Sequence, residues 1–269
     1  MSTLGDLREK KRKKEIDQIK AAMASGVKST PNLLRNIVSL IRQRVAANVE
    51  GKQCNSIVSE VSSLVSKVTA ETLKFDAKQV LLAVDAHNKT NHYKPAPVIY
   101  IPVHECPVVS MGIFFLRSSN SVIPMHDHPE ITGCIKVIHG TAVIKQVDAQ
   151  QDSEMTRREP SLFRVARSET TVLSSNQEEV VTIEPKNFNF HEISVAPPSS
   201  DSPQLLENMA FFDVLFPPYE PPIRDCHYFV HPVLVNNEEY MKKLDGAPSH
   251  DVFSTDLGPY FGPLLEFDD

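Results

Sequence analysis

The chain has 269 residues, of which 41% are hydrophobic, so it can bury a sizeable core in one domain with an appendage. A net charge of -6 and an isoelectric point near 5.9 argue against a protein that binds nucleic acid through phosphate contacts. No apolar run approaches the roughly 20 residues that a bilayer span requires, and the N-terminal MSTLGDLREKKRKK lacks the apolar stretch of a secretory signal. We therefore expect neither a membrane protein nor a secreted one.

The cysteines and the basic N-terminal run bear on location. Cys54, Cys106, Cys134 and Cys226 show no paired spacing of the zinc-ribbon kind, which fits a reduced intracellular compartment. The run Lys10–Lys14 could serve as a nuclear-import signal, although a solvated helix face is the favoured interpretation. We expect a monomeric cytoplasmic protein, with entry into the nucleus left open.

Residues 1–94 predict a helical region. Thr30 followed by Pro31 marks a helix start, because a hydroxyl can cap the first turn and proline fits the first helical position. Two apolar faces of helical period follow, one over residues 33–45 and the other over residues 57–68. We predict that these helices cover one side of a β-domain, with a partner-binding surface as the alternative.

Strand-like segments begin after Lys94-Pro95-Ala96-Pro97 and continue to about His231. They are apolar or alternating runs separated by polar breaks or a turn glycine. The clearest of them are Val108–Leu116, Val122–Met125, Ile131–Ile138 and Thr141–Val147. The sequence therefore predicts a mainly β domain over residues 95–235 and a polar, acidic C-terminal tail over residues 236–269.

The most informative feature within this domain is His126-Asp127-His128. Alternate residues of a β-strand face the same side, so the two imidazoles point into one space and Asp127 is turned away. A third imidazole from His191, in the segment PKNFNFH, would complete one face of a metal ion and leave positions open for substrates. Three neutral imidazoles suit Fe(II), and they leave its charge to be balanced by an anionic ligand such as a thiolate.

The same segments resemble the cupin superfamily, in which a His-x-His motif with a downstream glycine, here Gly140, precedes a Pro-x-Gly-x-x-His motif. Longer stretches are similar to consecutive segments of the 2-aminoethanethiol (cysteamine) dioxygenase and plant cysteine oxidase family of thiol dioxygenases. The resemblance covers about Pro95 to Pro232, with a weaker echo over Leu64–Asp76. It implies a cupin-type double-stranded β-barrel, or jelly roll, with the N-terminal helices packed on it. The stretches are SMGIFFL (110–116), IPMHDHP (123–129), IKVIHGT (135–141), FDVLFPPY (212–219) and RDCHY (224–228).

The resemblance also implies an activity: an Fe(II) enzyme that adds O2 to a thiol and yields a sulfinic acid. The implied substrates are cysteamine and proteins with an N-terminal cysteine, which both carry an amine two carbons from sulfur. Either a bidentate S,N chelate of the metal or a nearby carboxylate would place that amine. Asp213 and Tyr219 are our candidates for positioning it beside the metal, with a turn-capping carboxylate and a packed tyrosine as the alternative. Cys226 and Tyr228 match a pair that forms a thioether crosslink in some relatives, and a buried cysteine beside a packed tyrosine is the alternative.

A site for free cysteine would need a cation for the substrate carboxylate. No arginine is well placed for that purpose in the sequence, although Arg117 and Arg224 lie within the predicted domain. We therefore favour cysteamine or a Cys-initiated peptide as the substrate, with Arg117 and Arg224 left open as the cation that free cysteine would need.

Two positions depart from the family pattern. Glu130 stands where the family usually has glycine. If the strand alternation continues, the Glu130 side chain faces the metal. If the chain turns there, the side chain points to the mouth of the pocket, which is the favoured interpretation. Pro185 lies six residues before His191 instead of five, and we expect Asn187 or Asn189 to take the left-handed conformation of the missing glycine. These departures keep two alternatives open: a non-catalytic cupin that binds a metal or a partner, and another metal-dependent cupin enzyme.

Overall fold

A computed structural model describes residues 32–49, 57–151, 154–197, 208–250, 252–265 and 267. The helix face expected at Lys10–Lys14 and the helix start expected at Thr30-Pro31 lie outside these residues. The helices are α2 (Asn32–Val49), α3 (Ile57–Val65), α4 (Ala77–Asn91) and the short α5 (Glu154–Arg158). The strands are β1 (Val98–Cys106), β2 (Val109–Leu116), β3 (Val122–Asp127), β4 (Thr132–His139), β5 (Thr141–Gln150), β6 (Leu162–Ser174), β7 (Val181–Ile183), β8 (Phe190–Val195), β9 (Met209–Phe216), β10 (Phe229–Val235), β11 (Glu238–Lys243) and β12 (Thr255–Leu257).

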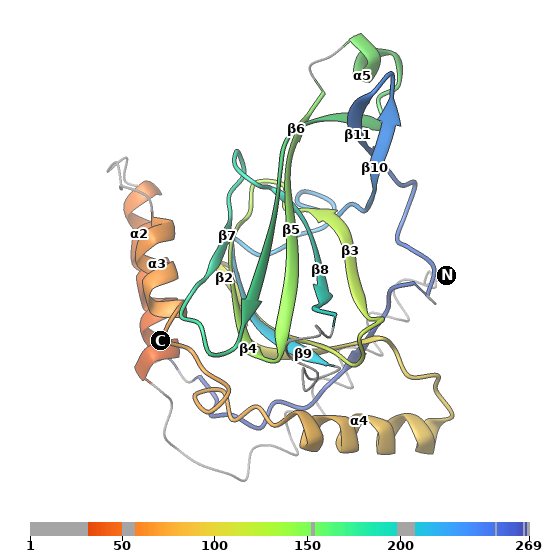
Figure 1. Ribbon diagram of the computed structural model, residues 1–269. Helices are drawn as coiled ribbons and strands as arrows, with labels where there is room; N and C mark the ends of the chain where they lie inside the picture. Colours follow the sequence, from red (N-terminus) through yellow and green to blue (C-terminus); the bar gives the residue numbers. More distant parts are fainter. Residues whose placement is uncertain are drawn as a thin grey trace, which may run out of the picture.

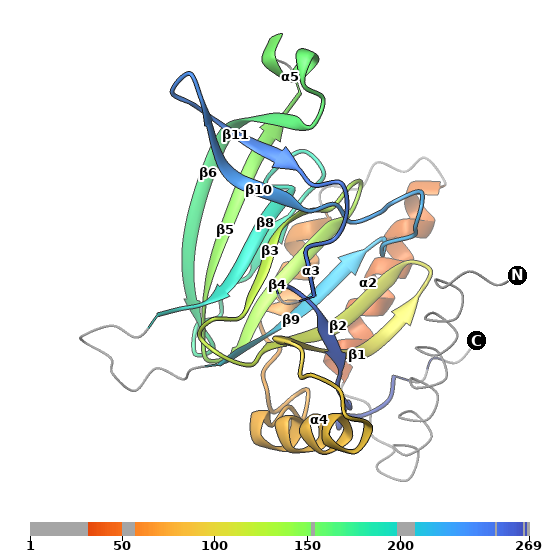
Figure 2. The same ribbon diagram turned by 90° about the vertical axis from the view of Figure 1, so that its right-hand side faces the viewer.

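The strands form two six-stranded sheets, with the orders β12-β1-β2-β9-β4-β7 and β10-β11-β6-β5-β8-β3. Pairing is antiparallel except between β1 and β12. Figures 1 and 2 show the two sheets facing each other, with β3, β5 and β8 opposite β2, β4 and β9. This arrangement confirms the predicted mainly β fold with a cupin-type barrel.

The first sheet separates two hydrophobic cores. Because side chains alternate along a strand, Phe211 of β9 enters the barrel core and Phe212 enters the core beneath the helices. Helices α2 and α3 lie on that outer face, as Figure 1 shows, and bury one apolar stripe each. The prediction that N-terminal helices cover one side of the barrel is therefore confirmed for the part of the chain described. The helix residues buried there include Leu34, Ile37, Ile41, Val61 and Val65.

A third, smaller core lies on the outer face of the second sheet and is formed by Met125, Val147, Phe190, Phe229 and Met241. The hairpin of β10 and β11 brings Phe229 and Met241 to it. The segment just before β10 returns to the free edge of β3, where the Asp127 amide donates to the His227 carbonyl over 3.1 Å. Strand β3 is therefore held between the barrel core and this third core.

Local signals in the sequence explain the ends of several elements. Asp76 caps α4 by accepting a hydrogen bond of 2.8 Å from the Gln79 amide, and His92 ends the helix in the left-handed conformation. Gly140 joins β4 to β5 at φ 70°, where a Cβ atom would lie 2.4 Å from the Asn208 carbonyl oxygen. Only glycine fits that turn without displacing the backbone opposite it.

Residues beyond 235, expected from the sequence to form a tail, supply two strands. Strand β11 pairs with β10 and β6, and β12 pairs in parallel with β1. The division of the chain into three parts remains a prediction. Within the described ranges, none of the helices combines the length and the apolar character needed to cross a lipid bilayer.

Candidate metal centre

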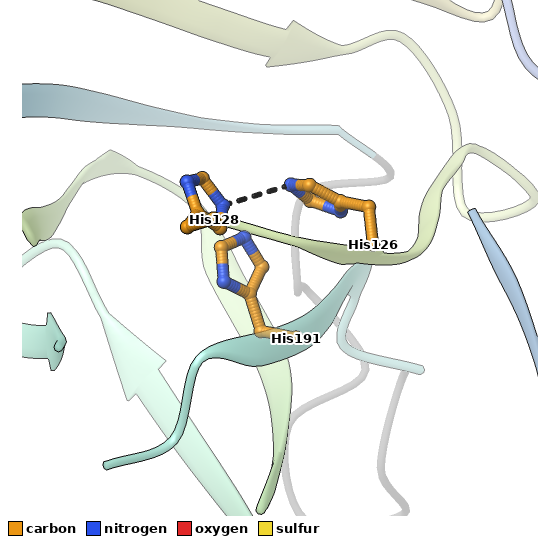
Figure 3. A group of neighbouring side chains, drawn as sticks. All are labelled: His126, His128 and His191. Atoms are coloured by element: carbon orange, nitrogen blue, oxygen red, sulfur yellow. Dashed lines mark hydrogen bonds between the residues drawn. The ribbon is translucent and has the colours of Figure 1, made fainter. Parts of the chain in front are cut away.

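Three histidines from two paired strands meet inside the barrel (Figure 3). His126 lies on β3 opposite His191 of β8 in the strand register, and His128 follows directly after the end of β3. One ring nitrogen from each lies within 4.8 Å of the others, and all three side chains are buried. The structure thus brings together the three residues that the sequence selects as metal ligands.

The tautomer of His126 follows from its partner. Its Nδ1 lies 2.8 Å from the carbonyl oxygen of Pro124, and a carbonyl can only accept a hydrogen bond. Nδ1 therefore carries the proton, and Nε2 presents its lone pair to the barrel interior. A backbone carbonyl that orients a ligand imidazole in this way is usual in protein metal sites.

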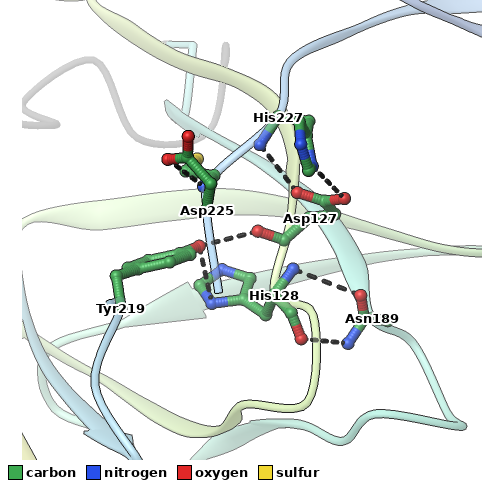
Figure 4. Close-up of polar contacts among 7 residues, drawn as sticks. Asp127, His128, Asn189, Tyr219, Asp225 and His227 are labelled. Carbon is green, nitrogen blue, oxygen red and sulfur yellow. Dashed lines mark hydrogen bonds and ion pairs between the residues drawn. The ribbon is translucent and has the colours of Figure 1, made fainter. Parts of the chain in front are cut away.

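His128 is oriented by Tyr219, as Figure 4 shows. The tyrosine hydroxyl donates to the Asp127 carbonyl oxygen over 2.7 Å and lies 3.0 Å from Nδ1 of His128. Because its single hydrogen is used on that carbonyl, the hydroxyl must accept from Nδ1, which therefore carries the proton. Nε2 of His128 is left with a free lone pair as well.

The two free lone pairs face each other. Nε2 of His126 lies 3.1 Å from Nε2 of His128, a repulsive contact unless a proton or a cation lies beside both atoms. Metal–imidazole bonds are about 2.1 Å long, so two ligands at a right angle would place their nitrogens ~3 Å apart. The spacing and the neutral nitrogen donors fit a first-row divalent metal, Fe(II) included.

Burial keeps these imidazoles neutral. It lowers the pKa of His126 and, more strongly, the pKa values of His128 and His191, and the neighbouring rings lower the last two further. A neutral imidazole is the form that binds a metal, so no proton has to be removed at neutral pH.

Glu130 does not join this group. It lies in a turn closed by the Ile131 amide, which donates to the His128 carbonyl over 3.1 Å, and its side chain is exposed. Its φ of 58° turns the chain away from the direction of β3. The alternative in which Glu130 supplies a carboxylate ligand is therefore wrong, because the turn breaks the strand alternation on which it rested.

The left-handed residue before His191 is Phe188, with φ 52°, rather than either asparagine, so that expectation was wrong. Counted back from the histidine, residue 188 is the third position, where the family motif has its glycine. Its amide donates to a carboxylate oxygen of Asp148, and the guanidinium of Arg167 lies 4.1 Å from the centre of its ring. These contacts hold a bulky residue in a conformation that glycine adopts more easily.

Asn189 has a different function, which the sequence did not indicate. Its Oδ1 accepts from the His128 amide over 3.2 Å, and its Nδ2 donates to the His128 carbonyl over 2.6 Å. The side-chain amide thus pairs with the backbone of His128 as a neighbouring strand would, at the point where β3 ends. It fixes the backbone of a metal-ligand candidate (Figure 4).

Asp213 lies on β9 in alternation with Phe211, so it faces the barrel interior. Its side chain is 8% exposed, and Oδ1 has no hydrogen-bond partner. Burial raises the pKa of this carboxyl group to about 7. A buried carboxyl group whose Oδ1 lacks a hydrogen-bond partner is suited to receive a cationic group from a ligand.

Cys226 and Tyr228 lie beside the histidines. The Cys226 thiol is in hydrogen-bond contact with the hydroxyls of Tyr219 and Tyr228, and burial raises the pKa of the thiol to about 11. The ring centre of Tyr228 lies 6.1 Å from that of His126. All four residues selected as catalytic candidates thus lie at or near the three-histidine group or face the same interior.

The chain is similar to a family of known proteins. The PCO_ADO family model matches residues 64–255. The chain is 32% identical over 187 residues to 2-aminoethanethiol dioxygenase of Mus musculus, a match that covers 64% of this chain and 67% of the relative. It is 31% identical over 135 residues to plant cysteine oxidase 1 of Arabidopsis thaliana, covering 50% of this chain and 42% of the relative.

Among solved structures, a cupin superfamily protein from Desulfitobacterium hafniense is similar at 10% identity with a TM-score of 0.29, over 46% of this chain and 81% of that one. The family model covers well over half of the chain. The protein therefore belongs to the PCO_ADO family, the 2-aminoethanethiol dioxygenase and plant cysteine oxidase family of thiol dioxygenases.

Proposed function

We propose that this protein is a non-haem Fe(II) enzyme that adds both atoms of O2 to the sulfur of a thiol and releases a sulfinic acid. The observation that carries the proposal is the pair of proton-free Nε2 atoms, 3.1 Å apart, within a buried three-histidine group of a PCO_ADO family member. His126, His128 and His191 would hold the ion, which would favour the thiolate form of the substrate and pass electrons from sulfur to O2.

The overall reaction balances without another reductant. One thiol and one O2 give one sulfinic acid: sulfur is oxidised, both oxygen atoms are reduced and end on sulfur, and the thiol proton ends on the product. The chain need not supply an electron donor or a second cofactor. Its residues have to bind the thiol, exclude competing water and keep the three imidazoles deprotonated at Nε2.

The proposed substrates are cysteamine and proteins that begin with cysteine. Both present a protonated amine two carbons from the sulfur, and the Asp213 carboxyl group, whose Oδ1 lacks a hydrogen-bond partner inside the barrel, would pair with it. Free cysteine would also need a cation for its carboxylate. Arg117 is paired with Asp85 and Arg224 with Glu220, so neither guanidinium is left unpaired for that role.

Oxidation of an N-terminal cysteine would link O2 supply to the turnover of a protein, if the sulfinic acid marks its carrier for degradation. We include this oxygen-dependent signal in the proposal because a Cys-initiated peptide and cysteamine share the recognised groups. The same site would then serve both substrates.

The test is a single-turnover oxidation. Purified protein is loaded with Fe(II) without air, mixed with O2 and either a Cys-initiated peptide or cysteamine, and analysed by mass spectrometry. We expect a gain of two oxygen atoms on sulfur. The matched controls are the His191→Ala variant and a peptide with an acetylated N-terminus, and neither should give product. If neither substrate gains oxygen while the wild-type protein holds iron fully, the proposal is wrong.

A further inference from the structure

Asp127 and His227 are joined by three hydrogen bonds, although 100 residues separate them in the chain. The His227 amide donates to Oδ1 of Asp127 over 2.7 Å, and its Nδ1 donates to Oδ2 over 3.0 Å. The third bond runs from the Asp127 amide to the His227 carbonyl over 3.1 Å. Figure 4 shows the carboxylate receiving both groups of the histidine.

Asp127 lies between two ligand candidates, and its two ends have different partners. Its carboxylate points away from the three histidines and holds His227, whereas its carbonyl accepts the Tyr219 hydroxyl that orients His128. A displacement of Asp127 would therefore shift the Tyr219 hydroxyl and, through it, the ring of His128.

His227 lies between Cys226 and Tyr228, the two residues that contact each other beside the metal centre. The backbone of Tyr228 forms an isolated bridge with His126. Among the described residues, this segment does not pair with β3 as a continuous strand. The Asp127–His227 pair supplies side-chain hydrogen bonds that attach this segment to β3.

We propose that Asp127 and His227 act as a positioning pair, which fixes the segment Cys226–Tyr228 and the ring of His128 in the places that thiol oxidation requires. The inference deepens the proposed function and rests on it for its catalytic consequence. Neither residue touches the reacting atoms. Both act through their neighbours, so loss of the pair should loosen the site without unfolding the barrel.

The test compares two changes at one position. His227→Ala removes the side-chain donor, whereas His227→Asn keeps an N–H group close to the place of Nδ1. His250→Ala is the matched control, because His250 is exposed and lies outside the centre. Four quantities are measured: the alkylation rate of Cys226 by peptide-resolved mass spectrometry, the affinity for Co(II), and kcat and KM with a Cys-initiated peptide.

For His227→Ala we expect several-fold faster alkylation of Cys226, a loss in Co(II) affinity on the order of 10-fold and a lower kcat. His227→Asn should recover most of each loss, and His250→Ala should match the wild type. Wild-type alkylation and Co(II) affinity in the folded His227→Ala protein would overturn the proposal. These two readouts need no turnover, so a wild-type protein that oxidises no thiol would refute the proposed function alone.

Discussion

Two residues beside the metal centre adopt the left-handed conformation without being glycine. Glu130 follows His128 at φ 58°, and Phe188 precedes His191 at φ 52°. This conformation brings the Cβ atom too close to the following carbonyl, at a cost of roughly 1–2 kcal/mol for each residue. Phe188 recovers part of that cost through its contacts with Asp148 and Arg167, whereas the side chain of Glu130 is exposed.

Glu130→Gly should therefore stabilise the protein. The variant relieves the strain and removes no buried surface, although the greater freedom of glycine in the unfolded chain offsets part of the gain. We expect the free energy of unfolding in urea to rise by about 1 kcal/mol. Glu179→Gly, at an exposed position with ordinary backbone angles, should lose stability instead. A loss of stability in Glu130→Gly would contradict the argument.

Tyr219→Phe tests how one hydroxyl group controls the metal centre. The variant leaves Nδ1 of His128 and the Asp127 carbonyl without their shared partner, so the ring can rotate and change its tautomer. We expect the affinity for Fe(II) or Co(II) to fall by about 10- to 100-fold in a chelator competition. Tyr93→Phe, at a half-exposed tyrosine outside the centre, is the control. Unchanged affinity in Tyr219→Phe would mean that packing alone orients His128.

At the scale of elements, a single carboxylate joins three parts of the fold. Asp256 of β12 accepts from Nδ2 of Asn88 on α4 over 2.7 Å and from the Ala96 amide before β1 over 3.1 Å. Nη1 of Arg117 lies 3.9 Å from the same oxygen. Helix α4 and the last strand of the first sheet are thus held at one end of the barrel.

Asp256→Ala should be costly because it leaves the buried Asn88 amide and the Ala96 amide without their acceptor. We expect a loss of about 2–3 kcal/mol in the free energy of unfolding, measured by chemical denaturation. Asp245→Ala, at an exposed aspartate, should change little. The metal affinity of folded Asp256→Ala should equal that of the wild type, and a large drop would show that the end of the barrel and the metal centre are coupled.

Local patterns account for most of the barrel and for the ligand set. Apolar alternation predicted strands near β2, β3, β4 and β5, and the spacing of His126 and His128 predicted that both face one side. Partners far apart in the chain could not be predicted in this way. The side chain of Asn189 bonds the backbone of His128, 61 positions earlier in the chain. Strand β12 pairs with β1, which lies more than 150 residues before it. Such contacts depend on the assembled sheets rather than on any local period.

For the whole molecule, the metal should contribute to stability. A ligand that binds only the folded state adds about 2.7 kcal/mol when its concentration is 100 times Kd. We expect Fe(II), added without air, to raise the thermal midpoint of the wild-type protein. His191→Ala should show no such rise and should retain no iron, whereas retention at the wild-type level would mean that the third ligand lies elsewhere.

Buried acids and bases make the stability of the metal-free protein depend on pH in two opposite ways. The histidines have lowered pKa values, so the unfolded chain binds more protons below its histidine pKa of about 6.5, and stability falls as the pH drops. Asp213 has a raised pKa of about 7. Between pH ~4 and ~7 the folded chain retains this proton while the unfolded chain has lost it, so stability falls as the pH rises.

Asp213→Asn separates the two effects because an amide does not titrate. We expect the free energy of unfolding of the variant, relative to that of the wild type, to increase by roughly 2–4 kcal/mol as the pH rises from about 4 to about 7. Above that range the difference between the two proteins should stay constant. Only the histidine effect remains in the variant, so its free energy of unfolding should fall more steeply than that of the wild type as the pH drops. Urea unfolding of both metal-free proteins across this range measures the difference directly. A difference that does not change with pH would mean that Asp213 is ionised in the folded protein and pairs with a cation.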